Sequence, residues 1–216
     1  MNRRWGELND VPRNEAYEIG IRKINDVLTW SVEEEIPMVT MWGFSTENFQ
    51  RDSEEISKLF GLFEKDLLTI LTRKDDMLKR DVRIRFLGRT DLFPKKISDM
   101  FNRVEDLTKG ATKYSLNLLL AYGGRAEIVD AVNAAIKAGE TPVDEKILSE
   151  HMYTHGLPDT DLVIRTSGAQ RTSGFLPWQT VYSEIYFSNK LWPDFTKEDF
   201  SDALRFYEKT QRRFGK

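Results

Sequence analysis

The sequence alternates short apolar segments, rich in β-formers, with longer segments whose apolar residues recur every three or four positions. A short apolar run that leads straight into polar residues is typical of a buried strand, and apolar residues at helical spacing indicate an amphipathic helix. The predicted strands are residues 36–44, 82–88, 114–125 (ending in a Gly-Gly turn), 161–165 and 184–187. The predicted helices are residues 14–30, a long helix from about residue 53, and residues 92–108, 126–138, 144–152 and 197–213.

This alternation predicts an α/β fold with a mostly parallel central sheet flanked by helices. A length of 216 residues suits a single domain, residues 1–216, with a substantial core. Ligands of such sheets bind at the carboxyl ends of the strands. Polar residues follow three of the predicted strands, at 45–48, 122–125 and 165–173, so these loops are predicted to share one rim.

Composition excludes several classes of function. The net charge of −3 argues against a broad nucleic-acid surface, which needs a basic excess. The chain has no cysteine and two histidines, so disulfides, thiolate metal sites and three-histidine zinc sites are excluded. His151 and His155 are interpreted as a helix end or solvated turn. No apolar run approaches a membrane span and no signal peptide is recognisable, so a cytoplasmic location is expected.

The loop at residues 165–174 carries two arginines, Arg165 and Arg171, among serines and glycines. Guanidinium groups match phosphate oxygens, and glycines allow the backbone to approach a ligand closely, so the loop could hold a polyanion. The alternative is a solvated turn whose arginines pair with surface acids. A second basic cluster, Asn2 to Trp5 with Arg13, precedes the first predicted helix, where the helix dipole favours an anion. Two phosphate sites would suit two phosphorylated substrates.

Glu184 follows the arginine loop in sequence. An acidic group near concentrated negative charge makes sense if a divalent cation lies between them, and the alternative is an ordinary carboxylate at a strand end. The long helix from residue 53 places Phe60, Phe63, Leu67 and Leu71 on one face. Core packing explains most of this apolar surface, although a pocket with a polar rim and an apolar interior would suit a diphosphate with a hydrophobic tail.

Seven sequence blocks together resemble the cis-prenyltransferases, the undecaprenyl diphosphate synthase group, over essentially the whole chain. The blocks are NRRW (2–5), FSTEN (44–48), YGGR (122–125), IRTSG.QR.S.F (164–175), Y.E.YF (182–187), LWPDF (191–195) and RRFG (212–215). The resemblance implies an α/β sheet, a dimer, Mg²⁺, and elongation of an allylic diphosphate by isopentenyl diphosphate with a new Z double bond. It also implies that membrane contact occurs only through the lipid product.

The same resemblance assigns roles to individual residues. It places Asn2, Arg3, Arg4 and Arg13 at the allylic diphosphate (the N-terminal cradle), and Arg165, Arg171 and Ser173 at isopentenyl diphosphate (the loop cradle). Ser45, Asn48 and Arg51 line the reaction centre, Trp5 and Phe44 shape the pocket, and Glu184 lies near magnesium. Arg213 and Gly215 match an element that reaches into the neighbouring subunit, so a homodimer is expected, with a heterodimer as the other option.

Three departures from the family pattern bear on these assignments. An apolar strand ending in Asp-Gly precedes NRRW in the family, and Met1 stands where the glycine would be, so the functional protein is expected to have an additional N-terminal strand ending in aspartate. Ala169 replaces a common glutamate, and alanine there also occurs in members that make irregular, branched couplings. Ala121 replaces a common asparagine, and Tyr17 a common histidine.

Three functions remain open on the sequence. The first is a catalytic cis-prenyltransferase, with regular or irregular, non-head-to-tail products. The second is a non-catalytic or partly catalytic subunit of a heteromeric complex, which the absent aspartate favours and the presence of Arg165, Arg171, Ser173 and Glu184 opposes. The third is a generic diphosphate-binding module.

Overall fold

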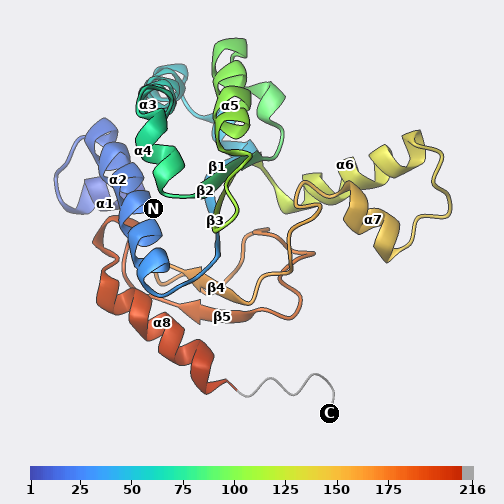
Figure 1. The fold of residues 1–216 in the computed structure, drawn as a ribbon. Helices are drawn as coiled ribbons and strands as arrows, with labels where there is room; N and C mark the ends of the chain where they lie inside the picture. The colour runs from blue at the N-terminus through green and yellow to red at the C-terminus, as the bar shows by residue number, and fades with distance from the viewer. Residues whose placement is uncertain (211–216) are drawn as a thin grey trace. The chain divides into compact units, whose positions relative to one another are not determined.

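The structure is a computed structural model that describes residues 1–210, except for the side chains of residues 76 and 77. Figure 1 gives the order of the elements along the chain. Contacts divide the chain into two compact units. Among the described residues, unit 1 comprises residues 1–30 and 158–210, and unit 2 comprises residues 31–157.

Unit 2 is built on three parallel strands, β1 (Met38–Ser45), β2 (Val82–Leu87) and β3 (Tyr114–Tyr122). Their order is β1-β3-β2, with β3 in the centre. The register pairs Met38 with Ser115 and Val82 with Tyr114, so all three strands end at the same edge of the sheet. The central strand is the most deeply buried, since Leu119 and Tyr122 are fully inaccessible to solvent.

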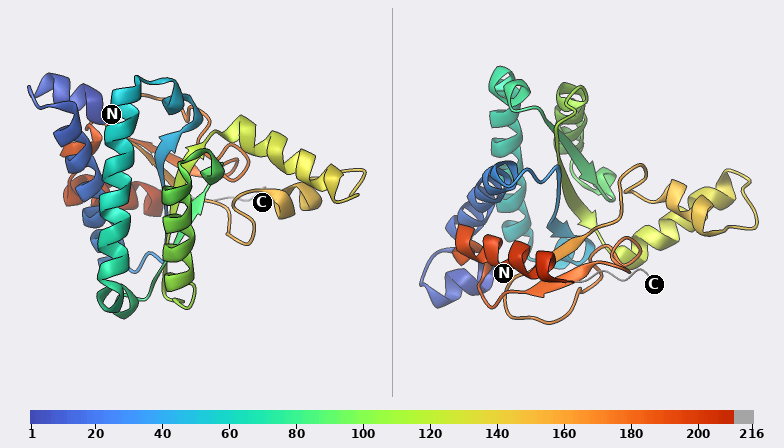
Figure 2. Two further views of the ribbon diagram at one scale, coloured as in Figure 1. Left: turned by 90° about the horizontal axis from the view of Figure 1, so that it is seen from above. Right: turned by 60° about the horizontal axis from the view of Figure 1, so that its bottom comes forward.

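The helices of unit 2 cover this sheet and extend from it. They are α3 (Ser53–Thr72), α4 (Lys74–Lys79), α5 (Lys95–Thr108), α6 (Gly124–Lys137) and α7 (Glu145–His151), with short 3₁₀ turns η1 (Thr46–Gln50) and η2 (Thr90–Leu92). Helices α3 and α5 lie side by side, whereas α6 and α7 pack on each other away from them (Figures 1 and 2). Helix α5 packs on β2, and the ring centroids of Phe86 and Phe101 are 4.5 Å apart.

Helix α5 also closes the outer edge of β2. The backbone N–H of Ile84 donates to Thr108 Oγ1 at 3.0 Å, and that of Phe86 donates to Glu105 Oε1 at 2.7 Å. Unpaired edge groups are a template for pairing with another chain, so these two side chains protect the edge.

Unit 1 contains a second parallel pair, β4 (Leu162–Arg165) and β5 (Glu184–Phe187). Around it lie α1 (Asn2–Leu8), α8 (Lys197–Lys209), the 3₁₀ turn η3 (Trp192–Asp194) and most of α2 (Arg13–Glu33), whose last residues belong to unit 2. Helix α8 packs on β5, and the ring centroids of Tyr186 and Phe206 are 5.6 Å apart.

The α/β fold class with parallel strands and flanking helices is confirmed, with differences in detail. In the described part of the chain, the strands form two hydrogen-bonded sheets, β1-β3-β2 and β4-β5. The basic cluster expected just before the first helix is itself helical, as α1. The last helix, expected to reach residue 213, ends at Lys209. Within residues 1–210, no helix combines the length and the apolar character needed to cross a membrane.

Candidate functional site

The loop that follows β4 carries two arginines close together in sequence, Arg165 and Arg171. Arg165 ends β4 and is half-buried, and its Nε is buried without a hydrogen-bond partner among the described residues. Burial lowers the pKa of Arg165 below its usual range, and the positive charge of Arg171 lowers it further. A buried donor left unpaired is unfavourable, as is a pair of like charges. An anion that accepts a hydrogen bond from Arg165 Nε pairs this donor, and its negative charge offsets the repulsion between Arg165 and Arg171.

Arg85 provides a comparison, because its Nε is also buried without a hydrogen-bond partner among the described residues. Arg85 on β2 also has a lowered pKa, through burial and repulsion from Arg83, but Glu105 opposes that shift. No acidic side chain is among the causes of the shift at Arg165. The loop after β4 is therefore the better candidate for an anion.

The backbone of this loop is held in a tight, partly left-handed path. Ser167 and Gly168 have φ of 86° and 69°, and Ser173 has φ of 54°. The N–H of Ser167 donates to Lys190 O at 2.6 Å and that of Gly168 to Ser188 O at 2.9 Å, which fixes the start of the loop against the segment after β5. Successive N–H groups in such turns can form an anion-binding concavity.

Helix α1 brings the N-terminal cradle against the loop cradle within unit 1. Arg4 Nη2 donates to Ser167 O at 2.7 Å, and Thr166 Oγ1 lies 2.9 Å from Met1 Sδ. The two basic segments, predicted as separate sites, are thus in direct contact. Arg13 lies at the start of α2, with its Nη2 3.8 Å from Glu7 Oε1.

Glu184 is not brought to Arg165 within the chain. The register pairs Glu184 with Leu162, at the opposite end of the strands from Arg165, a separation of about 10 Å along the strand. Side chains alternate between faces, so Glu184 shares a face with Tyr186, against which α8 packs, and Arg165 points to the other face. Closeness in sequence was a poor guide here because parallel strands begin at one edge and end at the other.

The described residues contain no group of three or more histidine, aspartate or glutamate side chains that could hold a metal ion by themselves. Mg²⁺ is commonly held by one or two carboxylates together with substrate phosphates. Because Glu184 lies at the far end of the strands, this chain's own geometry does not place it at the loop cradle.

In unit 2, the predicted reaction-centre residues form a local structure of their own. The backbone N–H of Ser45 donates to Asn48 Oδ1 at 3.1 Å, and the Ser45 side chain accepts from the backbone of Asn48, which makes a capping box at the start of η1. Arg51 Nη1 lies 3.3 Å from Oε1 of the largely buried Glu55. Phe44 is 2% exposed. It packs in a cluster of aromatic rings with Phe49, Phe60, Phe63 and Phe93.

The turn after β3 lies next to this capping box. Ser45 is in register with Tyr122, and a Cβ on Gly123 would lie 2.9 Å from Thr46 Oγ1, so glycine permits the close approach. Ala121 adopts φ of 47°, a left-handed conformation that asparagine tolerates better than alanine. This explains in physical terms why asparagine suits that position.

A buried carboxylate supports the same turn. Glu127 is fully buried and accepts from Tyr122 Oη at 2.5 Å and from the backbone of Tyr153 at 3.1 Å. A further loop, after β2, joins this rim, where Arg89 binds both carboxylate oxygens of Asp130 at 2.8 Å. Sequence reasoning missed both carboxylates, since neither lies in a recognisable pattern.

The structure therefore brings together two groups of predicted residues, one in each unit. The loops 45–48 and 122–125 meet in unit 2, and the N-terminal and loop cradles meet in unit 1. A single rim that also includes loop 165–173 stays a prediction. Arg213 and Gly215 lie outside the described residues.

Comparisons with known proteins find a family that matches nearly the whole chain. Residues 1–215 match the profile of a prenyltransferase family described as undecaprenyl diphosphate synthase. A tritrans,polycis-undecaprenyl-diphosphate synthase (geranylgeranyl-diphosphate specific) of Methanocaldococcus jannaschii is 41% identical over 223 residues, covering 100% of this chain and 79% of the relative.

Two solved structures share the fold. A probable undecaprenyl diphosphate synthase from Campylobacter jejuni has a TM-score of 0.81 at 32% identity, covering 92% of this chain and 93% of that one. Lavandulyl diphosphate synthase from Lavandula x intermedia, solved in complex with dimethylallyl diphosphate, has a TM-score of 0.88 at 29% identity, covering 100% and 94%.

Proposed function

The chain belongs to the undecaprenyl diphosphate synthase family of prenyltransferases, and we propose that it joins isopentenyl diphosphate, or a similar C5 diphosphate, to an allylic prenyl diphosphate. The product carries a new Z double bond. The observation that carries this proposal is the half-buried Arg165, whose Nε has no partner among the described residues and which stands beside Arg171. A diphosphate supplies acceptor oxygens and negative charge to these two arginines.

The reaction needs two diphosphates held close together. The allylic C–O bond breaks and its electrons leave with the diphosphate, the alkene of the C5 substrate forms the new C–C bond, and a proton is lost to restore a double bond. Arg4 donates to the loop that carries Arg165 and Arg171, so cationic groups for both diphosphates lie in one unit. These groups stabilise the departing diphosphate, and the reaction is faster because the two substrates are held close together.

Mg²⁺ belongs to the proposal as a companion of the substrates. When bound, it neutralises diphosphate charge. Glu184 was expected to lie near the metal, and its place at the opposite end of β4 and β5 does not fit a site shared with Arg165 of the same chain. Diphosphate binding is therefore assigned to the arginines of the two cradles.

Irregular coupling is a second candidate. The lavandulyl diphosphate synthase that shares the fold favours it, as does Ala169 in the loop cradle. A glutamate at that position would pair with Arg171 or with a metal, and alanine leaves the C5 substrate freer to change its angle. A small change in angle decides which carbon meets the allylic cation.

The role of a non-catalytic subunit is not favoured, because the relatives that match the chain over its length are named as synthases. A homodimer and a cytoplasmic location remain part of the proposal. The expected dimer rests on the terminal Arg213 and Gly215 in the sequence.

The experiment offers dimethylallyl, geranyl, farnesyl and geranylgeranyl diphosphates to the purified protein with Mg²⁺, each with and without isopentenyl diphosphate, and identifies products by chromatography and NMR. Z-prenyl or branched products are expected when an allylic diphosphate and isopentenyl diphosphate are both present. An allylic diphosphate offered alone should give product only if it can act as both substrates. Arg171→Ala should lower kcat/KM by about tenfold or more, as loss of a charge-assisted contact does. Arg205→Ala on α8, a matched exposed arginine paired with Asp202, should be unaffected. Absence of product with every donor contradicts the proposal.

A further inference from the structure

Helix α1 carries most of the N-terminal cradle, yet it cannot hold its own position. It has seven residues, and its N-cap, Met1, makes no side-chain capping bond. Isolated helices of this length are marginal in water, so tertiary contacts must fix it. Besides the bond from Arg4 to the loop cradle, the contacts that do so include one at Trp5 and one at Asn2.

The first contact joins α1 to η3. Trp5 Nε1 donates to Asp194 Oδ1 at 2.6 Å, across 189 residues of sequence. A hydrogen bond to a carboxylate is stronger than one between neutral groups. The neighbouring Pro193 is buried, which anchors the 3₁₀ turn that presents Asp194.

The second contact joins α1 to α2. Gly20 is buried within α2, and a Cβ at this position would lie 2.2 Å from Asn2 Nδ2 and 2.6 Å from Asn2 Cγ. Glycine is unfavourable in a helix interior compared with alanine. Its presence here is explained by the room it gives to the side chain of Asn2.

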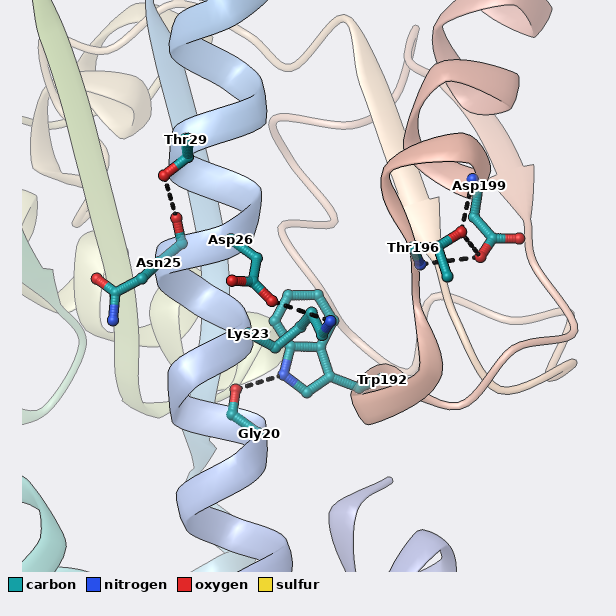
Figure 3. A network of polar contacts seen from close by, with 8 residues as sticks. All are labelled: Gly20, Lys23, Asn25, Asp26, Thr29, Trp192, Thr196 and Asp199. Atoms are coloured by element: carbon teal, nitrogen blue, oxygen red, sulfur yellow. Dashed lines mark hydrogen bonds and ion pairs between the residues drawn. The ribbon is translucent and has the colours of Figure 1, made fainter.

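The turn η3 also binds α2 at that same glycine. Trp192 Nε1 donates to Gly20 O at 2.7 Å (Figure 3). Further along α2, Lys23 Nζ and Asp26 Oδ2 form an ion pair at 3.0 Å. Beyond η3, a capping box at Thr196 starts α8. Trp192 thus fixes the turn to α2, and the same turn places Asp194 against Trp5 of α1.

We propose that Asp194 and Gly20 are positioning residues for the N-terminal cradle. Asp194 fixes the indole of Trp5, and Gly20 admits the side chain of Asn2, so that Arg4 reaches the loop cradle. Neither residue needs to touch substrate. This inference rests on the proposed function, and it assigns the two residues specifically to the allylic diphosphate.

The first test compares Asp194→Ala, Asp194→Asn and Asp199→Ala by steady-state kinetics. Asp194→Ala should raise KM for the allylic diphosphate by about tenfold and that for isopentenyl diphosphate by less than about threefold. Asp194→Asn keeps an acceptor oxygen for Trp5 and should restore most of the affinity. Asp199→Ala breaks the capping box of α8 without touching α1, so it should lower Tm and leave both KM values unchanged.

The second test separates positioning from stability, because the expected changes in stability and in substrate affinity have opposite signs. Gly20→Ala should leave Tm unchanged or raise it, because alanine favours the helix, while displacing Asn2 and raising KM for the allylic substrate. Gly61→Ala is the matched control, since Gly61 lies in α3 with no atom within 4 Å of an added Cβ. It should raise Tm and leave KM unchanged. A gain in stability with a loss of affinity cannot result from unfolding.

The inference is overturned if allylic KM is unchanged in both Asp194→Ala and Gly20→Ala, or if the two control variants raise it equally. If the wild-type protein converts no allylic diphosphate, the proposed function fails, and amide hydrogen exchange of α1 then decides the positioning contact. Faster exchange of α1 in Asp194→Ala than in Asp199→Ala supports it, and equal exchange in the two variants overturns it.

Discussion

Replacing Arg165 by methionine tests whether this arginine is kept for a ligand at the expense of stability. Methionine retains an unbranched apolar stem and removes the guanidinium. In the unliganded protein the Nε of Arg165 is buried without a partner among the described residues, and such a group costs about 1–3 kcal/mol. Removing it, together with repulsion from Arg171, should stabilise the unliganded fold by roughly 1 kcal/mol.

Binding should change in the opposite direction. Loss of a charge-assisted contact of roughly 2 kcal/mol raises Kd about 30-fold. At a diphosphate concentration of about 100 wild-type Kd, the wild-type protein gains about 2.7 kcal/mol of unfolding free energy. The variant, then at only about three times its own Kd, should gain about 0.9 kcal/mol.

Urea unfolding with and without inorganic diphosphate measures both effects. Arg205→Met is the control, because Arg205 is exposed on α8 and should change stability by less than about 0.5 kcal/mol while keeping the full gain from diphosphate. If Arg165→Met is less stable than the wild type without ligand and still gains about 2.7 kcal/mol with it, Arg165 is a structural residue and the reasoning is wrong.

Three further outcomes are expected. Asn48→Asp keeps the acceptor of the capping box, so stability should change by less than about 1 kcal/mol, and a fall in kcat would then show that the amide N–H₂ acts in the reaction. Ala121→Gly relieves a left-handed residue and should be at least about 1 kcal/mol less destabilising than Ala131→Gly in α6, measured by urea unfolding. The hydrogen bonds from Arg89 lower the pKa of Asp130, so its contribution to stability is present above about pH 4 and is lost as pH falls below that value. The difference in unfolding free energy between wild type and Asp130→Asn should therefore shrink as pH falls below about 4, and a difference that stays constant there would contradict this assignment.

The sequence predicted the strands well because apolar runs and polar ends are local signals. Residues 184–187 form a strand with the predicted bounds, and β4 differs by one residue. Helix α1 was missed for the opposite reason. Its sequence, NRRWGEL, has no apolar periodicity, and it is fixed by contacts such as that of Trp5 with Asp194, far away in the chain.

The candidate site was predictable in its residue types and not in its geometry. The arginines of both cradles stand out in the sequence as clusters of charge, and the structure shows one bond between the two cradles, from Arg4 to the backbone oxygen of Ser167. The position of Glu184 required the register of β4 and β5, which no local pattern specifies. The role of Gly20 required the approach of Asn2 from another helix.

The central claim is that the loop after β4 binds the diphosphate of the C5 substrate through Arg165 and Arg171. The most direct measurement is a crystal structure with a thio-substituted, unreactive analogue of isopentenyl diphosphate. We predict a diphosphate oxygen within about 3 Å of Arg165 Nε, with Arg171 on the same diphosphate. A fully occupied analogue bound elsewhere, with Arg165 Nε still lacking a partner, would contradict the claim.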